Sequence, residues 1–183
     1  MKKYILPLAS LAVTTVIFLT IYTVSQQVLR MDANDPQIQL AEDTAAQLNS
    51  GADPHKTTTS SVDLNASLAP FVNVYDTQGQ SVAGAGYLNS YLATPPFGML
   101  KSSDNQPYNA VTWQPSSNIR IAAVAVRASR YYVVSGRSLK EVEKQENQIL
   151  ALSGFGWLIS IFIIACSYAI LNLETLKTKS RKK

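Results

Sequence analysis

The chain has 183 residues, of which 46% are hydrophobic, and its 16 Lys and Arg against 12 Asp and Glu give a formal net charge of +4 at pH 7. Its single cysteine, Cys166, excludes an intramolecular disulfide. The basic excess falls in the two tails and not in the central part, which argues against a nucleic-acid-binding surface.

Residues 4–27, which follow a basic start at residues 1–3, form the first of two long apolar stretches. No Asp, Glu, Lys, Arg or His occurs from Tyr4 to Leu29, and about 20 apolar residues suffice to cross a bilayer. The stretch exceeds the apolar core of a cleaved signal peptide, which is about 7–15 residues, and no A-x-A-like site follows it. We therefore predict a retained transmembrane helix.

Residues 28–137 are predicted to form one small α+β domain, because about 110 residues suffice for a core without disulfides. A helix is expected to start with Asp35 as its N-cap and Pro36 in the first turn, and to end at Gly51. The polar segment 51–61 reads as a loop. It contains the only histidine, and a lone histidine makes no metal site, so no metal or cofactor is expected.

Strand patterns begin after this loop. Residues 71–75 and 81–83 flank the turn-forming segment 76–79 and predict a β-hairpin. Prolines at 95 and 96 predict a short helix that ends near Lys101, within a connector of residues 84–107. Three further β-rich runs follow at 110–114, 119–126 and 131–135. Together these elements predict an antiparallel sheet of about five strands with the helices on one side.

A second membrane span is predicted after the domain. Ser138 and Glu141 have the spacing of a capping box, which starts an exit helix at residues 138–150. No Gly or Pro occurs from Leu139 to Ser153, so this helix is expected to continue into a transmembrane helix at residues 151–172. A basic tail, residues 173–183, follows.

Charge beside the two apolar stretches predicts the topology. Cytoplasmic flanks of membrane spans carry excess Lys and Arg. Lys2 and Lys3 precede the first span, and five basic residues follow the second, whereas the segment between is close to neutral. We expect a two-pass protein of the inner membrane with both termini in the cytoplasm and the central domain outside it. Whether the outer compartment is a periplasm or the cell exterior stays open.

Four segments carry a resemblance: FVNVYDTQG (71–79), PPFGML (95–100), VTWQP (111–115) and YYVVSGRSLKEVEKQENQ (131–148). Their order before a membrane span resembles the extracytoplasmic PAS-like or Cache-like input modules of bacterial sensor histidine kinases. The likeness covers roughly residues 33–172. It implies that the stretch after Gly136 is the helix that carries a signal to the membrane. Because only Asn172–Lys183 follow the second span, we expect the signal to pass to a separate membrane protein.

The same resemblance implies the candidate ligand site. In such modules the ligand lies between the sheet and the connector, which makes Tyr87, Tyr91, Trp113 and Arg120 the tentative ligand-binding residues. The alternative is that the aromatic residues fill the core or coat the surface and that the arginine faces solvent. In the second span, Gly156 and Ser160 form a small-xxx-small pair that suits helix packing, either on the first span, on a second copy in a homodimer or on a partner.

No motif in the chain points to catalysis. GxSxG, HExxH, CxxC and phosphate-binding loops do not occur, so we expect a protein that is not an enzyme. Two functions remain. The first is a sensor-like membrane protein that binds a small ligand or a protein and signals to a membrane partner. The second is a structural or accessory subunit of a membrane complex, with no small-molecule ligand.

Overall fold

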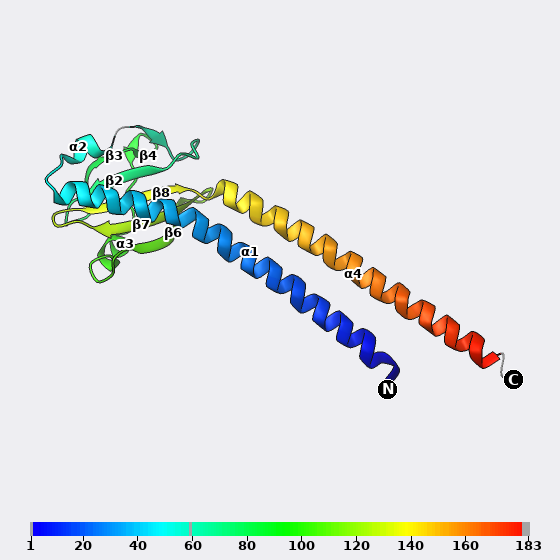
Figure 1. The fold of residues 1–183 in the computed structure, drawn as a ribbon. Helices are drawn as coiled ribbons and strands as arrows, with labels where there is room; N and C mark the ends of the chain where they lie inside the picture. The colour runs from blue at the N-terminus through cyan, green and yellow to red at the C-terminus, as the bar shows by residue number, and fades with distance from the viewer. Residues whose placement is uncertain (1, 59, 181–183) are drawn as a thin grey trace. The chain divides into compact units, whose positions relative to one another are not determined.

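The computed structural model describes residues 2–58 and 60–180, with side chains described up to Leu173 (Figure 1). The basic side chains predicted to flank the two spans, Lys2, Lys3 and those after Leu173, lie outside the described side chains. The chain divides into two compact units. One is an α+β unit, Leu29–Lys144, and the other joins Met1–Val28 to Gln145–Lys183.

A five-stranded antiparallel sheet forms the centre of the α+β unit, with the order β3-β2-β8-β7-β6. The predicted hairpin is confirmed, since β2 and β3 pair across the turn at residues 76–79, and the three further β-rich runs are confirmed as β6, β7 and β8. The strand bounds are β2 (Phe71–Tyr75), β3 (Ser81–Gly84), β6 (Asn109–Ser116), β7 (Ile119–Arg127) and β8 (Tyr132–Ser138).

A second, three-stranded sheet was not predicted. It consists of β1 (Val62–Asp63), β4 (Gly86–Leu88) and β5 (Tyr91–Leu92), with β1 parallel to β4 and β4 antiparallel to β5. Two of these strands lie in the segment that was expected to be a connector. Strands of two or three residues are too short to show a period in the sequence, so the pattern could not reveal them.

Helix α1 (Lys2–Asn49) corrects the prediction of a separate helix that begins at Asp35. Asp35 and Pro36 lie inside one continuous helix. An interior proline removes a backbone hydrogen bond and costs about 3 kcal/mol, and burial of the following turns against the sheet offsets this cost. The predicted end is confirmed: Gly51 has a φ of +95°, and the amides of Gly51 and Ala52 donate to carbonyls of the last helical turn, which is a Schellman motif.

Two short helices lie between the strands. The segment predicted as a loop contains α2 (Pro54–Thr57), which Asp53 caps by accepting the amide of His55 at 3.0 Å. The short helix predicted in the connector is confirmed as α3 (Phe97–Ser102), with Pro96 as its N-cap. The helix start predicted at the capping box is confirmed, since α4 (Lys140–Ser180) begins there, but Ser138 Oγ accepts from the amide of Lys140, at 3.3 Å, and not from that of Glu141 as a capping box requires.

The helices do not lie on one side of the sheet, as predicted, because both faces of the five-stranded sheet are covered. Ala41, Ala45 and Leu48 of α1 pack on one face, and Figure 1 shows this part of α1 lying across the strands. Met99 and Leu100 of α3, together with the small sheet, pack on the opposite face. Strand β7 is therefore buried on both sides over most of its length, which explains its nearly continuous apolar sequence.

Buried hydrogen bonds join the two sheets. Asn73 of β2 is fully buried, and its amide Nδ2 donates to the carbonyl oxygens of Gly86 and Ala93, while its Oδ1 accepts from the amide of Gly86 at 2.8 Å. The Tyr75 hydroxyl donates to the Ala93 carbonyl as well. Since buried polar groups are costly without partners, this network specifies how the small sheet is placed on the large one.

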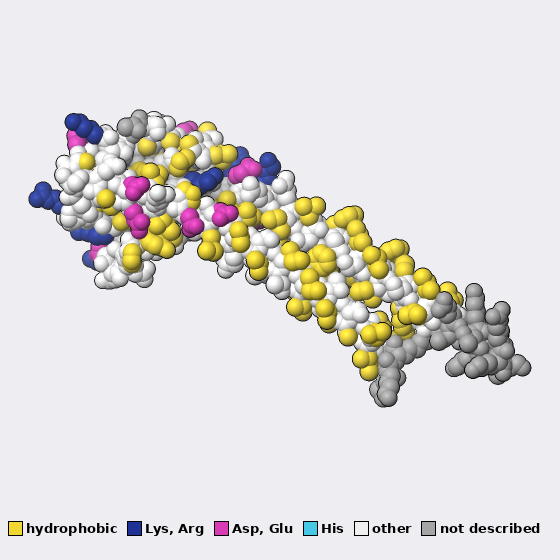
Figure 2. All heavy atoms as spheres, in the orientation of Figure 1, with side chains coloured by type: hydrophobic (Ala, Val, Ile, Leu, Met, Phe, Trp, Pro, Cys, Tyr) yellow, Lys and Arg dark blue, Asp and Glu magenta, His cyan; other side chains and the backbone are white. Residues whose placement is uncertain are grey.

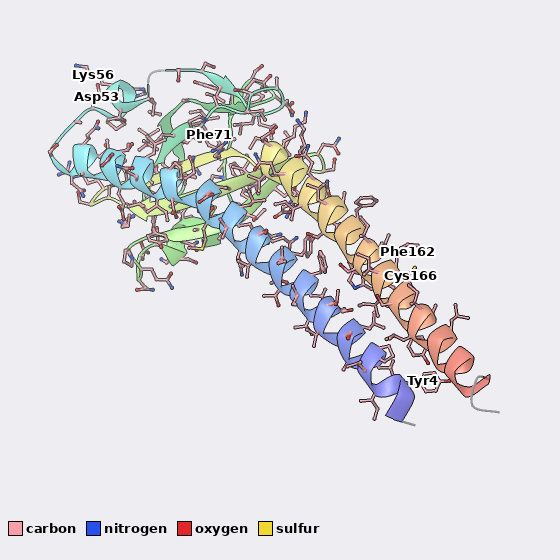
Figure 3. The ribbon with its side chains drawn as sticks, turned by 45° about the vertical axis from the view of Figure 1, so that its right-hand side comes forward. Tyr4, Asp53, Lys56, Phe71, Phe162 and Cys166 are labelled. Carbon is pink, nitrogen blue, oxygen red and sulfur yellow. The ribbon has the colours of Figure 1, made fainter. Side chains whose placement is uncertain are left out.

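The ring of Phe71, labelled in Figure 3, lies against two glycines. A Cβ atom at Gly86 would lie 2.3 Å from the Phe71 ring, and one at Gly136 would lie 2.8 Å from it. Contacts this short do not occur between real atoms, so the ring needs glycine at both positions. Close approach, and not a special backbone angle, is the reason for these two glycines.

The second unit consists of the apolar parts of α1 and α4. Both helices are long and apolar enough to cross a membrane, by length and composition, which confirms the two predicted apolar stretches. Figure 2 shows hydrophobic side chains over the described part of these helices, while the Lys, Arg, Asp and Glu side chains gather on the α+β unit. The exposed apolar surface of the two helices would be unfavourable in water and suits a lipid environment.

Candidate functional site

A polar cavity of about 260 Å³ lies where the five-stranded sheet, the loop after β1 and the first turn of α4 meet. The loop supplies residues 64–68, β7 supplies Arg120, and α4 supplies Lys140 and Glu143. The strands bring Arg120 there because β7 starts beside the end of β8, from which α4 leaves. One sheet corner thus gathers two basic side chains and one acidic side chain.

Arg120 is attached to the first turn of α4 in two ways. Its Nη1 lies 2.6 Å from Glu143 Oε1, and its carbonyl oxygen accepts the amide of Leu139 at 2.8 Å. Below this ion pair, Leu139 and Val142 of α4 are buried against Ala33 of α1 and Ala122 of β7. The first turn of α4 is therefore held by a small apolar cluster and by one exposed ion pair.

A second polar recess, of about 480 Å³, lies on the outward face of the small sheet. The residues that line it come from β1, β4 and the segments beside them, and all carry polar groups. They are Ser61, Asp63, Asn65, Tyr87, Asn89 and Ser90.

The four predicted ligand residues do not converge. Arg120 lines the cavity at α4, and Tyr87 lines the recess on the small sheet. Trp113 is buried in the core beside its strand partner Ile121, on the face of the sheet opposite to the one that Arg120 occupies. Tyr91 has 79% of its surface exposed. Trp113 therefore fills the core, as the alternative interpretation predicted. Arg120 and Tyr87 line two different polar depressions.

A third group of polar side chains surrounds Tyr132. Its hydroxyl donates to Asp104 Oδ1 at 2.9 Å, and the guanidinium of Arg127 lies over its ring, with Cζ 4.4 Å from the ring centroid. Burial, together with the hydrogen bond to Asp104, raises the pKa of Tyr132, although the charge of Arg127 opposes this shift. Arg127 Nε also lies 3.7 Å from Asp104 Oδ1, while its Nη1 is buried without a hydrogen-bond partner among the described residues. The group therefore links β7, β8 and the turn after α3.

Among the ionisable side chains outside these groups, the two relevant properties are clustering and shifted pKa values. No three or more His, Cys, Asp or Glu side chains of the described part come together as a metal site. In the α+β unit, the strongest perturbation of an ionisable group is that of Tyr75, whose pKa burial raises far above its ordinary value while the hydrogen bond from Asn73 lowers it. Tyr75 serves the network between the sheets and reaches neither polar depression.

The helix-packing candidates lie in the second unit. A Cβ at Gly156 would lie 2.9 Å from the ring of Phe18, so this glycine allows α1 to approach α4 within the same chain, and the Ser160 hydroxyl donates to the Gly156 carbonyl at 2.9 Å. The indole of Trp157 donates to Thr15 Oγ1 at 3.1 Å. Figure 3 places Phe162 and Cys166 on the same helix, where both are exposed.

Sequence reasoning missed most of both depressions. Lys140 and Glu143 were assigned to the exit helix without a role, and Asp63, Asn65, Asn89 and Ser90 lie in segments that looked like ordinary polar loop. The available signal was the density of Asn, Asp and Ser beside Tyr87, which is also typical of turns.

Compared with models of protein families, with curated proteins and with solved structures, the chain matches none of them, and no family is assigned to it.

Proposed function

We propose that this protein is a two-span protein of the inner membrane whose α+β domain lies outside the cytoplasm, binds a small polar solute and passes the signal through α4 to a membrane partner. The observation that carries the proposal is the polar cavity at the start of α4, because its wall includes both the sheet and the helix that contains the second apolar stretch. A solute bound there would contact the signalling helix directly.

The charges around the cavity favour an anionic group on the solute. Arg120 and Lys140 contribute two positive charges and Glu143 one negative charge, so the wall is net positive. An anion that binds Arg120 would compete with Glu143 for the same guanidinium. This competition links solute binding to the contact between β7 and α4.

The energies permit such an exchange. The Arg120 and Glu143 side chains are 44% and 38% exposed, and an ion pair of that exposure contributes at most about 1 kcal/mol. A solute at ten times its Kd adds about 1.4 kcal/mol of binding free energy. Binding can therefore release Glu143 while Leu139 and Val142 keep α4 attached to the domain.

The fold is consistent with the sensor interpretation. A five-stranded antiparallel sheet with a long helix across one face is consistent with the resemblance to PAS-like and Cache-like input modules. Each apolar stretch belongs to a helix, α1 or α4, whose other end is part of the α+β unit. The predicted topology, with basic flanks inside, would place the cavity outside the cytoplasm. The partner would be another membrane protein or a second copy of this chain.

The test is thermal unfolding of the full chain in lipid nanodiscs against phosphate, sulfate, small carboxylates and amino acids. We expect at least one anionic solute to stabilise the protein saturably, and Arg120→Gln to abolish the effect. Arg130→Gln, which changes an exposed arginine in the turn before β8, is the matched control and should keep the effect.

Hydrogen exchange gives the second readout. The stabilising solute, and separately Glu143→Gln, should both lower protection of the amides of residues 143–146, which donate within the first turns of α4, because both remove the ion pair. A folded protein that no solute stabilises, or an effect that Arg120→Gln leaves intact, would contradict the proposal. It would favour the accessory-subunit function, which requires a stoichiometric protein partner instead.

A further inference from the structure

We propose that the recess on the small sheet is a second binding site, separate from the cavity at α4, and that it takes a neutral saccharide. The proposal starts from strand register. β1 and β4 are parallel neighbours, with Val62 opposite Gly86 and Asp63 opposite Tyr87. Val62 and Gly86 are buried in the core, so alternation directs Asp63 and Tyr87 together to the outward face.

The carboxylate of Asp63 is oriented before any ligand arrives. Its Oδ1 accepts the backbone amide of Asn65 at 2.9 Å and the side-chain Nδ2 of Asn65 at 3.1 Å. Among the described residues, none hydrogen-bonds to the second oxygen, Oδ2. The recess therefore offers one oriented acceptor, and Asn65 lines the recess as well.

The turn between β4 and β5 supplies the opposite rim. Asn89 and Ser90 have φ angles of +52° and +69°, and the flanking residues Leu88 and Tyr91 pair with each other. Two positive φ angles in a two-residue loop are those of a type I′ turn, in which glycine is preferred at the second position. Ser90 keeps a side chain where glycine would be less strained, and its hydroxyl lines the recess.

The chemistry of the lining selects the ligand class. The recess offers one carboxylate, two carboxamides, two hydroxyls and the ring of Tyr87, and no Lys or Arg lines its described wall. Sugar hydroxyls both donate and accept, which matches carboxamides and hydroxyls, and they donate well to a carboxylate. The phenol ring provides an apolar surface with a polar tip for the C–H face of a sugar ring. An anion would meet Asp63 with no cation to balance it.

The volume is consistent with a small sugar or with the end of a longer one. A recess of about 480 Å³ lies within the range of about 300–1,000 Å³ that is typical of small-molecule sites. Because Asn65 also lines the cavity at α4, it cannot distinguish the two sites. Asp63, Tyr87 and Asn89 line the recess and not that cavity.

The experiment is isothermal titration calorimetry of the full chain in lipid nanodiscs. The nanodiscs are prepared without maltoside or glucoside detergents, because the sugar head groups of these detergents could occupy the site. The probes are maltose, N-acetylglucosamine and sorbitol, with citrate and spermidine as the anionic and cationic comparisons. We expect saturable binding of at least one neutral probe and at least tenfold weaker binding by Asp63→Asn, which keeps an acceptor for Asn65. Tyr108→Ala changes an exposed tyrosine that lines neither depression, so it is the control and should keep full affinity.

Asn89→Gly is the second variant, which preserves the backbone of the turn because glycine tolerates the positive φ at this position. It should also weaken binding. Binding of spermidine or citrate alone, no binding of any neutral probe, or full affinity in both Asp63→Asn and Asn89→Gly would overturn the proposal. Arg120→Gln should keep saccharide affinity, so failure here and failure of the anion-sensor proposal are separate results.

A sedimentation assay distinguishes a free sugar from a surface glycan as the source of the saccharide. Insoluble polysaccharides, such as cellulose and chitin, are mixed with the nanodisc protein and sedimented. Retention that maltose or N-acetylglucosamine competes away, and that Asp63→Asn loses, would assign the site to a surface glycan. Saturable titration with soluble probes without retention would assign it to a free sugar.

Discussion

The two faces of the five-stranded sheet are covered by different kinds of contact. The face toward α1 is aliphatic, with valines of the strands packed on alanines and Leu48 of the helix. The face toward the small sheet carries large aromatic residues and the hydrogen-bond network of Asn73 and Tyr75. Aliphatic contacts are not directional, whereas hydrogen bonds are. The aromatic face is therefore held by directional hydrogen bonds together with packing, while the face toward α1 is held mainly by aliphatic packing.

The face toward α1 also carries buried polar residues, and one of them has an unpaired group. Gln37 of α1 is 2% exposed and its Oε1 has no hydrogen-bond partner among the described residues. The hydroxyl of Ser135 donates to the Gln37 carbonyl. One face therefore satisfies its central buried amide fully, and the other leaves an acceptor unpaired in the interface of the helix that also contains the first apolar stretch.

The largest expected effect is that of Asn73→Ala. It leaves the amide and carbonyl of Gly86 without their buried partner, so we expect a loss of about 3 kcal/mol in the free energy of unfolding. Urea denaturation of the full chain in detergent measures it. Val72→Ala, next in the chain but on the face toward α1, should cost about 2 kcal/mol. Equal costs at the two positions would contradict the comparison.

The second effect depends on pH. Tyr75 stays neutral in the folded protein because burial raises its pKa, while an unfolded tyrosine ionises near pH 10. The unfolded state then binds fewer protons above pH 10, and the contribution of Tyr75 to the free energy of unfolding should be constant up to that pH and fall by about 1.4 kcal/mol per pH unit beyond it.

Denaturation between pH 8 and pH 11 measures this slope. Tyr75→Phe should be less stable at pH 8, because it lacks the hydrogen bond to the Ala93 carbonyl, and its slope above pH 10 should be shallower. Tyr132, whose pKa is also raised by burial and by Asp104, accounts for part of the slope that remains. An unchanged slope in Tyr75→Phe would show that this hydroxyl is not buried as described.

The third effect is a gain. Gln37→Met removes the unpaired Oε1 at similar side-chain volume and should raise the free energy of unfolding by about 1 kcal/mol. Thr44→Val is the matched control, because Thr44 is also buried on α1 but its hydroxyl donates to the Leu40 carbonyl. A gain in the control, or a loss in Gln37→Met, would remove the distinction between the two faces.

The smallest effect lies in the small sheet. Ser90→Gly relieves a positive φ at the second position of the β4–β5 turn and should stabilise the protein by about 0.5 kcal/mol. Thermal unfolding measures this gain. If the recess binds saccharides, the same variant should bind them more weakly, since the hydroxyl of Ser90 lines it. A destabilised variant would mean that the hydroxyl contributes to the turn itself.

The sequence predicted the large sheet well because its strands are long enough to carry a pattern and are separated by turns with a clear chemistry. Asp76, for example, accepts amides of Gln78 and Gln80, as its place in the predicted turn implies. The continuous helix through Pro36 was not predictable, since the packing that outweighs the proline lies far away in the sequence. The small sheet was not predictable either, since its register comes from contacts with β2.

The candidate site was predicted only in fragments. Arg120 and Tyr87 do lie in polar depressions, but in two different ones, because alternation along a strand that is buried on both sides does not reveal which face a residue occupies. Glu143 reaches Arg120 from 23 positions further along the chain. A pair of charged residues at that separation has no local pattern, so only the folded chain brings it together.

The fit of Phe71 between Gly86 and Gly136 has an evolutionary consequence. Neither glycine can gain a side chain while the ring is present, and a smaller residue at position 71 would open a cavity that new side chains could fill. Distant relatives should therefore either keep an aromatic residue with both glycines or replace all three together, with a change at Ile121 as well, since its Cγ2 would also lie 2.8 Å from a Cβ at position 136. The combination of an aromatic residue at position 71 with glycines at positions 86 and 136 is therefore a criterion for finding relatives whose overall sequence identity is low.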